Sequence, residues 1–397
     1  MILGVVGKPS SGKSTFFNAA TMQDVPMAAY PFTTIEANKA VGFVRVECAD
    51  KDFNVQCNPR TGFCHNHTRY VPIELVDVAG LVPGAHEGKG MGNQFLSDLS
   101  RADLLIHVVD ISGSTNEKGD AVALGSHDPS KDIAFLEEEI DLWFLGILEK
   151  NWPKFARMPF ESKAKLVAAM AQNLSGVGAT EGQIDSCLLE LDFTDKKLDT
   201  WSEDDKKAFA KKFRERSKPV VIAANKADMP NAKENLERIK KQFPKRIIIP
   251  CSGIAELTLK RAAKDGSIDY VQGGKTFDVK KELSEKQKQG LEYIRKQVLE
   301  TFGTTGVQEV LEVAVFDVLK YIAIFPGGTK GLVDSMGRTM PDCFLMPPKT
   351  TSLDFAFKLH TDFGNHFIKA INVKTRQLIG KEHELAHRDV VEIVHGN

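Results

Sequence analysis

The sequence predicts an α/β protein with a doubly wound, mostly parallel β-sheet. Three observations support this fold class: short apolar runs, polar or glycine-containing turns directly after them, and helical stretches between most of them. The runs are continuous rather than alternating, as expected for parallel strands covered on both faces. They span residues 2–6, 71–76, 104–109, 220–224 and 247–249. In such sheets, ligands bind at the carboxyl ends of the strands.

The composition limits the class of protein. The chain has 397 residues, of which 42% are hydrophobic and 26% charged, so two or three folded domains are expected. A net charge of −1 excludes a globally basic nucleic-acid binder. Six cysteines do not make a disulfide scaffold and favour a reducing compartment, here the cytoplasm. No apolar run reaches the roughly 18 residues of a membrane span, and the first run lacks the basic start of a signal peptide.

The order of the segments indicates three regions. Residues 1–125 and 219–305 carry the predicted strands and form one discontinuous domain. The segment between them, 126–218, is far longer than a simple connection between parallel strands and has helical periodicity, so it predicts a helical insertion. Residues 306–397 contain short apolar runs separated by glycine and proline, typical of a small α+β domain.

A basic stretch lies near the end of the predicted insertion. Its members are Lys206, Lys207, Lys211, Lys212, Arg214, Arg216 and Lys218. A solvated helix face is the interpretation that we favour, and an RNA-contacting face is the alternative.

A phosphate-binding loop follows the first apolar run. Residues 7–14 fit the pattern GxxxxGK[ST] at every fixed position, and a helical segment follows, as this motif requires. In such a loop the backbone N–H groups cradle the β-phosphate, Lys13 neutralises phosphate oxygens, and Ser14 offers a hydroxyl to Mg²⁺. We therefore expect the P-loop NTPase version of the fold. The predicted nucleotide-binding residues here are Lys8, Pro9, Ser10, Ser11, Gly12, Lys13, Ser14 and Thr15.

Two further motifs complete the predicted magnesium and γ-phosphate site. Asp77 follows the run at 71–76 and would hold Mg²⁺ through water, while the N–H of Gly80 would meet the γ-phosphate. Thr34 lies between the first predicted helix and the next strand, where a threonine can complete the Mg²⁺ shell. The predicted metal ligands are therefore Ser14, Thr34 and Asp77.

The sequence Asn-Lys-Ala-Asp at 225–228 predicts a site for the base. The Asp228 carboxylate can accept hydrogen bonds from N1–H and the 2-amino group of guanine. Adenine lacks both donors and would leave this carboxylate desolvated and unpaired, so discrimination is expected to be large. Asn225 would tie the loops together, and the Lys226 stem would cover one face of the base. Ser252 and Gly253 lie where a backbone N–H is expected to reach guanine O6.

Together these motifs resemble those of the Obg family of translation-associated GTPases. Residues 30–34 look like the family's switch I, and residues 77–96 resemble its glycine-rich switch II. Within the family, the chain is most similar to the YchF-like branch, which shares a helical insertion and a C-terminal TGS domain. Residues 347–394 look like that domain, which implies a ubiquitin-like β-grasp fold within 306–397. The resemblance also implies a partner in the ribosome or its RNA.

Departures from the family pattern bear on activity. YchF-like proteins often carry Glu at the position of Asp228 and prefer adenine nucleotides, so the Asp favours GTP here. Leu81 stands where Ras-like enzymes have a water-orienting Gln, and we expect slow intrinsic hydrolysis. His86 is a candidate to approach the attacking water, although a solvated loop histidine is the interpretation that we favour. Some relatives carry a potassium-binding Asn at the position of Ser10, so potassium dependence stays open. The predicted catalytic residues are Lys13, Thr34, Gly80 and His86.

Cysteines and histidines gather between the first switch and the strand at 71–76. A structural Zn²⁺ held by Cys48, Cys57, Cys64 and His67 is one interpretation. The spacing is not CxxC, so the interpretation that we favour is a β-hairpin tip with reduced cysteines.

The sequence thus predicts a cytoplasmic, Mg²⁺-dependent GTPase with a low intrinsic rate that acts as a molecular switch. GTP and GDP are the expected ligands, and no membrane association is expected. Two alternatives remain open: a nucleotide-gated adaptor whose hydrolysis is incidental, and an ATPase of the YchF type.

Overall fold

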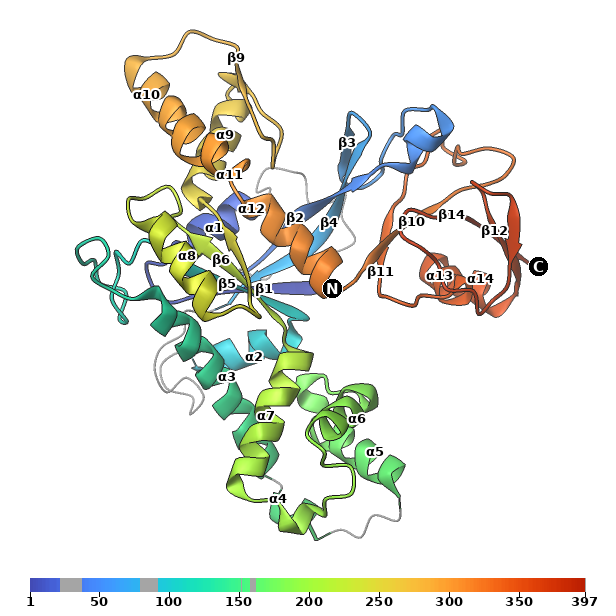
Figure 1. The fold of residues 1–397 in the computed structure, drawn as a ribbon. Coiled ribbons are helices and arrows are strands. Elements are labelled where there is room, and N and C mark those ends of the chain that lie inside the picture. Colours follow the sequence, from blue (N-terminus) through green and yellow to red (C-terminus); the bar gives the residue numbers. More distant parts are fainter. Residues whose placement is uncertain (22–37, 79–91, 151, 158–161, 397) are drawn as a thin grey trace. The chain divides into compact units, whose positions relative to one another are not determined.

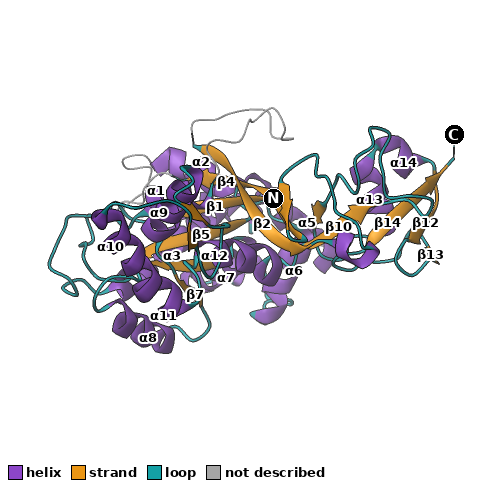
Figure 2. Cartoon of the chain, turned by 90° about the horizontal axis from the view of Figure 1, so that it is seen from above, coloured by secondary structure: helices purple, strands orange, loops and turns teal. Residues whose placement is uncertain are grey.

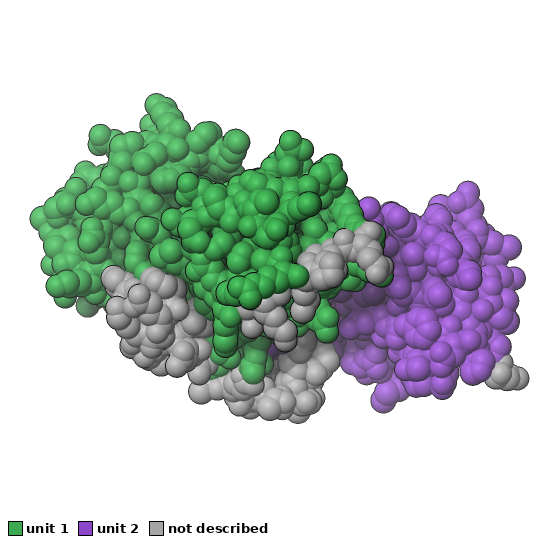
Figure 3. Space-filling model, turned by 90° about the horizontal axis from the view of Figure 1, so that it is seen from below, with its two compact units in different colours: residues 1–20, 37–40, 75–310 green, residues 21–36, 41–74, 311–397 purple. Residues whose placement is uncertain are grey.

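The computed structural model describes residues 1–21, 38–78, 92–150, 152–157 and 162–396. The chain forms two compact units, shown in different colours in Figure 3. The first comprises residues 1–20, 37–40 and 75–310, and the second comprises residues 21–36, 41–74 and 311–397. The second unit joins two segments that the sequence analysis placed in different domains, and the domain boundaries given there remain predictions.

A seven-stranded sheet forms the centre of the nucleotide-binding fold (Figure 1). Neighbouring pairs β1–β5, β5–β6 and β6–β7 are parallel, whereas β3 pairs with β4 in the antiparallel sense. The doubly wound, mostly parallel sheet is thereby confirmed. In spatial order the strands are β2 (Lys39–Glu47), β4 (Thr68–Asp77), β1 (Ile2–Val6), β5 (Leu104–Asp110), β6 (Val220–Asn225) and β7 (Ile247–Pro250), with β3 (Phe63–His65) beside β4.

Helices pack along this sheet because its apolar strands must be covered (Figure 2). All seven residues of β5 are buried, which explains its continuous apolar run. Helix α1 packs against α9, and both begin directly after a strand and its loop. Outside the insertion, the α-helices described up to residue 312 are α1 (Lys13–Ala20), α2 (Gly92–Arg101), α8 (Ala232–Gln242), α9 (Gly253–Lys264), α10 (Glu285–Ile294), α11 (Glu300–Phe302) and α12 (Val307–Glu312). A short hairpin of β8 (Ile268–Asp269) and β9 (Asp278–Val279) lies between α9 and α10.

The predicted helical insertion is present. It consists of α3 (Pro129–Lys150), α4 (Trp152–Phe155), α5 (Lys163–Asn173), α6 (Glu181–Glu190) and α7 (Glu203–Ser217). Aromatic side chains fill its core: Phe144 meets Phe213 edge-on, and Trp201 lies against Phe209. Ser202 opens α7 with a reciprocal capping box, which satisfies backbone groups that a helix end leaves unpaired.

Ion pairs use most of the charge of the basic stretch in α7. The Arg214 guanidinium is 2% exposed and donates to Asp141 Oδ1 at 2.8 Å. The Lys218 ammonium is also buried and donates to the carbonyls of Ser100 and Ala102. Further partners are Glu149 and Glu203 for Lys206, Glu190 and Glu215 for Lys212, and Glu190 for Arg216. We favoured a solvated helix face, but most of the basic side chains in this stretch form ion pairs with acidic residues of the insertion.

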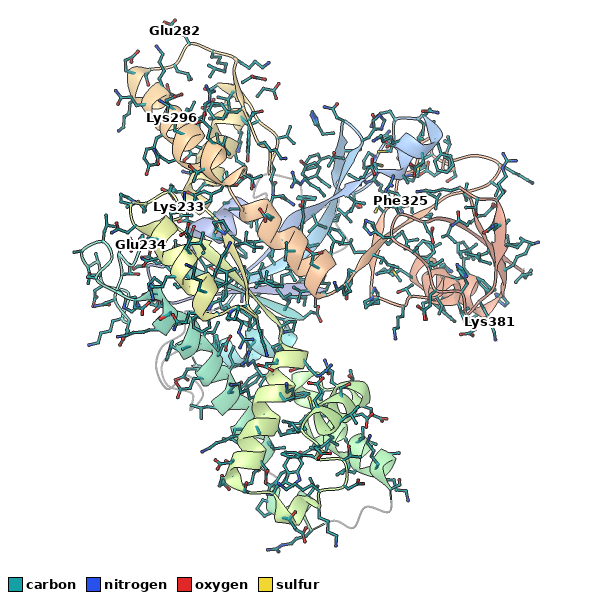
Figure 4. The ribbon with its side chains drawn as sticks, in the orientation of Figure 1. Lys233, Glu234, Glu282, Lys296, Phe325 and Lys381 are labelled. Carbon is teal, nitrogen blue, oxygen red and sulfur yellow. The ribbon has the colours of Figure 1, made fainter. Side chains whose placement is uncertain are left out.

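The second unit contains the predicted C-terminal α+β fold. Its five-stranded sheet is mixed: β10 runs parallel to β14, and β12 runs antiparallel to β14. Phe355 of α13 packs on this sheet and is fully buried, as is Phe325 of β10, labelled in Figure 4. The elements are β11 (Phe344–Met346), β10 (Ile322–Pro326), β14 (Val390–His395), β12 (Phe367–Asn372), β13 (Gln377–Ile379), α13 (Ser352–Leu359) and α14 (Thr361–Asn365).

None of the helices within the described ranges combines the length and the apolar character that crossing a membrane would require.

Candidate functional site

The P-loop connects β1 to α1 at the carboxyl end of the parallel sheet. Ser10 and Gly12 adopt left-handed backbone conformations, with φ of 61° and 87°. A Cβ at position 12 would collide with the side-chain amide of Asn225, so glycine is needed there for close packing as well as for its φ. The loop ends where Lys13 opens α1, which points the first backbone N–H groups of that helix at the site.

Lys13 forms an ion pair with Asp77, which stands at the end of β4. The pair brings together the predicted phosphate-binding cation and the predicted magnesium carboxylate. Ser14, in the first turn of α1, is exposed. Hydroxyl and carboxylate oxygens are the ligands that Mg²⁺ prefers, so the donors present here suit that ion.

Lys8 occupies a different place from the other P-loop residues. Its ammonium is buried and contacts Asp132 Oδ2 and the carbonyl of Thr115, both at 2.8 Å. These two contacts hold the Lys8 side chain inside the protein. A cavity of about 250 Å³ adjoins it; the cavity is lined by Gly7, Lys8, His107, Glu117, Lys131, Asp132, Phe135 and Leu136. Burial, together with the Lys8 charge, lowers the pKa of His107 to about 3.

Asn225 joins two loops of the site. Its Nδ2 donates to the carbonyl of Ser11 at 3.0 Å, and its Oδ1 accepts from the backbone N–H of Gly253, also at 3.0 Å. The backbone N–H of Ser252 donates to Thr305 O, while its hydroxyl caps α9. Both N–H groups that we assigned to guanine O6 thus have partners within the protein, and that role of Ser252 and Gly253 stays a prediction.

Asp228 carries a buried carboxylate oxygen without a protein partner. Oδ1 is inaccessible to solvent and has no hydrogen bond to any of the described residues. Ser11 Oγ, in the P-loop, is in the same situation. Buried polar atoms are nearly always hydrogen-bonded, so these two atoms suit a ligand that brings its own donors. Tyr293 holds the Asp228 backbone in place, because its hydroxyl donates to the Asp228 carbonyl at 2.7 Å.

A polar network that the sequence analysis did not find supports Lys226. The Lys226 backbone is left-handed (φ 61°), and its ammonium contacts Asp110 Oδ2 at 2.9 Å. Asp110 is fully buried and also accepts hydrogen bonds from Ser112, Ser114 and Thr115. Burial raises the pKa of Asp110, but the hydrogen bonds and the Lys226 charge outweigh it and hold that pKa below its usual value.

The loop after β5 also packs directly on the P-loop. Gly119 has φ of 88°, and a Cβ there would lie 2.8 Å from the carbonyl oxygen of Pro9. One loop therefore fixes both the phosphate motif and the base motif. A clustering of Ser and Thr immediately after Asp110, at the end of a buried strand, was the signal in the sequence.

Several predicted site residues lie outside the described residues. They are Thr34, Gly80 and His86, together with Leu81. Their predicted roles stay predictions.

The cysteine cluster forms a compact group in the second unit. One ligand atom from each of Cys48, Asp50, Cys57 and Cys64 lies within 4.8 Å of the others. His67, which the sequence analysis placed in this set, instead contacts Asp50 Oδ1 through Nδ1 at 2.9 Å. Asp50 takes its place because a short 3-10 helix, η2 (Ala49–Phe53), turns the aspartate inward.

Three family models match the chain. Residues 2–137 match a model described as a 50S ribosome-binding GTPase, and residues 223–327 match the G4 motif-containing domain of a YGR210-like, Obg-like GTPase. Residues 336–395 match the TGS domain.

Relatives in other organisms align over most of the chain. An uncharacterized GTP-binding protein of Methanocaldococcus jannaschii, MJ1332, is 43% identical over 99% of this chain and 98% of its own. One of Schizosaccharomyces pombe, C428.15, is 40% identical over 89% of this chain and 88% of its own. Obg-like ATPase 1 of Rattus norvegicus is 29% identical over 78% of this chain and 74% of its own.

Solved structures show the same architecture. A GTP-binding protein from Pyrococcus horikoshii OT3 superposes with a TM-score of 0.79 and 39% identity, and the match covers all of both chains. The YchF GTPase of Schizosaccharomyces pombe gives a TM-score of 0.59 with 19% identity, covering 99% of this chain and 97% of the other, which is a likeness of fold.

Proposed function

Because this chain belongs to the YchF-like branch of the Obg family of GTP-binding proteins, we propose that it is a slow, Mg²⁺-dependent GTPase that acts as a molecular switch. The observation that carries the proposal is the buried Oδ1 of Asp228 at the carboxyl end of the sheet, which has no hydrogen bond to any residue that the structure describes. Guanine supplies two N–H donors to such a carboxylate, and adenine supplies none. An adenine nucleotide would leave the carboxylate desolvated and unpaired.

The surrounding residues support binding of the triphosphate. The P-loop backbone and Lys13 would neutralise the phosphates, and Asn225 keeps the P-loop in register with the base loop. Mg²⁺ would be held by Ser14, by Asp77 through water, and by Thr34, and when bound it would neutralise charge on the phosphates. Lys226 is held by Asp110, so its stem is in a fixed position beside the base loop.

We expect slow turnover because the chain has no glutamine at the position that orients the attacking water in Ras-like enzymes. Leu81 replaces the Gln that orients water in Ras-like enzymes. His86 and the backbone of Gly80 are the remaining candidates within the chain, and a partner is the other source of the missing group.

Replacing Asp228 by Asn tests the base assignment. An Asn amide donates where the carboxylate accepts, so it suits the 2-carbonyl of xanthine in place of the 2-amino group of guanine. We expect Asp228→Asn to lose GTP affinity by at least about tenfold and to gain affinity for xanthosine triphosphate. Asp278→Asn, on the exposed strand β9, is the matched control and leaves both affinities unchanged. Unchanged GTP affinity in Asp228→Asn would refute the assignment.

The ribosome or its RNA is the partner class that we propose. Support comes from the family and from the family model that matches residues 2–137, which describes 50S ribosome-binding GTPases. The internally paired charges of α7 speak against that helix as the RNA-contacting face. Ribosome co-sedimentation with a non-hydrolysable GTP analogue and with GDP tests the switch. A difference between the two nucleotides supports it, and equal binding would favour the adaptor alternative.

ATP hydrolysis is the second candidate function. The relatives named Obg-like ATPase 1 favour it, although they are less than 30% identical to this chain. Retention of Asp228 favours GTP. The measured preference between the two nucleotides separates these candidates.

A further inference from the structure

Four side chains of metal-ligating types converge in the second unit. Cys48 follows β2, Asp50 lies in η2, Cys57 lies in the loop after η2, and Cys64 lies in β3 (Figure 1). Their ligand atoms all lie within 4.8 Å of one another. The Sγ atoms of Cys48 and Cys57 are 3.6 Å apart, and Cys64 Sγ is 4.0 Å from Asp50 Oδ2.

Three of the four side chains are buried: Cys48 and Asp50 are 0% exposed and Cys57 is 6% exposed. Cys64 is partly exposed. Removing a carboxylate from water costs several kcal/mol unless it is paired or bound to a metal. Within the described residues, the contacts to this carboxylate are the Cys57 N–H at 3.0 Å, the Cys64 thiol and His67 Nδ1 at 2.9 Å. No lysine or arginine forms an ion pair with Asp50 among these contacts.

We propose that Cys48, Asp50, Cys57 and Cys64 bind one Zn²⁺ ion as a structural site. In tetrahedral zinc–thiolate sites the Zn–S distance is about 2.3 Å, so neighbouring sulfurs stand about 3.8 Å apart. The 3.6 Å separation of Cys48 and Cys57 agrees with this edge. Three thiolates select zinc over Mg²⁺ or Ca²⁺, and four protein ligands leave no open position for catalysis.

The same separation is incompatible with a disulfide, whose sulfurs stand about 2.05 Å apart. All of the cysteines are free in the structure. If the cysteines were only residues of a hairpin tip, their side chains would have no reason to converge. That interpretation does not account for three sulfurs and one carboxylate oxygen that lie within 4.8 Å of one another.

His67 has a supporting position. Its Nδ1 bonds to Asp50 Oδ1, while Asp50 Oδ2 is the oxygen next to Cys64. A histidine that holds a ligating carboxylate fixes its orientation, and such partners are typically worth about 10–100-fold in metal affinity.

The proposed site would order the segment after Cys57, which forms backbone hydrogen bonds with residues 339–341 of the same unit. Directly after Cys57, the backbone N–H of Asn58 donates to Thr339 O at 2.8 Å, and that of Arg60 donates to Pro341 O at 2.9 Å. Buried Arg69, beyond Cys64, donates to the carbonyls of Met340 and Pro341. Zinc would therefore fix the hairpin that holds residues 339–341.

Metal analysis tests the proposal. The full-length protein is purified without chelators from cells supplied with zinc, and its metal content is measured by plasma mass spectrometry. We expect one zinc per chain, loss of most of it in Cys57→Ser and Cys64→Ser, and full retention in Cys187→Ser. Cys187 is the matched control, because it is a buried cysteine of α6 in the other unit. Absence of zinc in the wild type, or full retention in the double variant Cys57→Ser/Cys64→Ser, would overturn the proposal.

A second measurement has a main readout on the wild-type protein, which does not depend on the folding of the variants. Wild-type protein is stripped with a chelator and reconstituted with Co²⁺, which absorbs visible light strongly in tetrahedral thiolate sites. We expect this spectrum, and we expect faster amide hydrogen exchange at Asn58 and Arg60 in the stripped protein. His67→Ala should weaken Co²⁺ binding by about 10–100-fold, and Asp50→Asn by more. An octahedral cobalt spectrum, or exchange that does not respond to metal, would contradict the site. Guanine nucleotide affinity, measured alongside, reports on the proposed function separately.

Discussion

The side-chain amide of Asn225 donates a hydrogen bond to the backbone carbonyl of Ser11 at 3.0 Å. This bond joins the base-recognition motif to the P-loop, although the two residues lie 214 positions apart in the chain. The Oδ1 atom of the same side chain accepts a hydrogen bond from the backbone N–H of Gly253. One buried side chain therefore connects its own loop to the P-loop and to the loop before α9.

Asn225→Ala should therefore weaken nucleotide binding, because it removes the link between the base-recognition motif and the P-loop. The substitution removes both hydrogen bonds and leaves buried backbone groups unpaired, at a cost of about 1–3 kcal/mol. We expect GTP affinity to fall by about 10–100-fold in a fluorescence titration. Asn372→Ala, which loses a bond to Asp389 in the second unit, is the control. Equal affinities in the two variants would show that the Asn225 tie does not support binding.

Gly119→Ala should disturb the P-loop through Pro9, which Gly119 contacts. The new Cβ would press on Pro9, and alanine is strained at the φ of 88°. We expect a loss of about 1–3 kcal/mol in stability and weaker nucleotide binding. Gly176→Ala is the matched control, since a Cβ there meets nothing within 4 Å. Thermal unfolding and nucleotide titration of both variants check the prediction, and a Gly119 variant that behaves like Gly176→Ala would contradict it.

Arg214 should stabilise the insertion far more than its neighbour Arg216. Arg214 is 2% exposed and bonds to Asp141, whose side chain is only partly exposed, so Arg214→Ala leaves that carboxylate without this partner, at a cost of about 1–3 kcal/mol. Burial already raises the pKa of Asp141, and Arg214 counteracts this effect. Arg216, which pairs with Glu190 at the surface, should contribute about 1 kcal/mol or less. Urea unfolding of the two variants measures the difference, and equal losses would be inconsistent with the buried pair.

His107 should make the protein sensitive to acid. Burial lowers the pKa of His107 to about 3, whereas the unfolded chain protonates it near the ordinary value of 6.5. Between these values the unfolded state binds more protons, so stability falls as the pH falls below 6.5. From pH 7 to pH 5 the expected loss from this residue is about 2 kcal/mol.

His107→Gln removes that contribution, so the variant should lose less stability than the wild type over the same pH range. The exposed histidine His383 provides the control variant, His383→Gln, which should follow the wild type. Urea unfolding at pH 7 and pH 5 makes the comparison. A His107 variant with the wild-type pH dependence would refute the assignment.

The parts of the fold that were predicted from the sequence are those with local signals. The apolar run at 104–109 predicted strand β5 correctly, because a strand covered on both faces buries all of its side chains. The P-loop was identified because phosphate binding fixes the spacing of its glycines, lysine and serine. The C-terminal α+β fold followed from short runs and from the family resemblance.

The parts that were missed depend on contacts between distant residues. Arg69 bonds to carbonyls at 340 and 341, and no local pattern indicates such a partner. Asp110 directly follows the run at 104–109, but its role depends on Lys226, which lies 116 residues away. The zinc interpretation named His67 and did not consider Asp50, because the turn of η2 that points the aspartate inward leaves no local signal in the sequence.

The central claim is that Asp228 makes this protein select guanine nucleotides. The most direct test is competition between GTP and ATP for the wild-type protein in the presence of Mg²⁺, repeated with Asp228→Ala. We expect GTP to bind at least about tenfold more tightly than ATP, and we expect the variant to lose this preference. Equal or tighter binding of ATP by the wild type would contradict it and would place the protein with the adenine-preferring members of its branch.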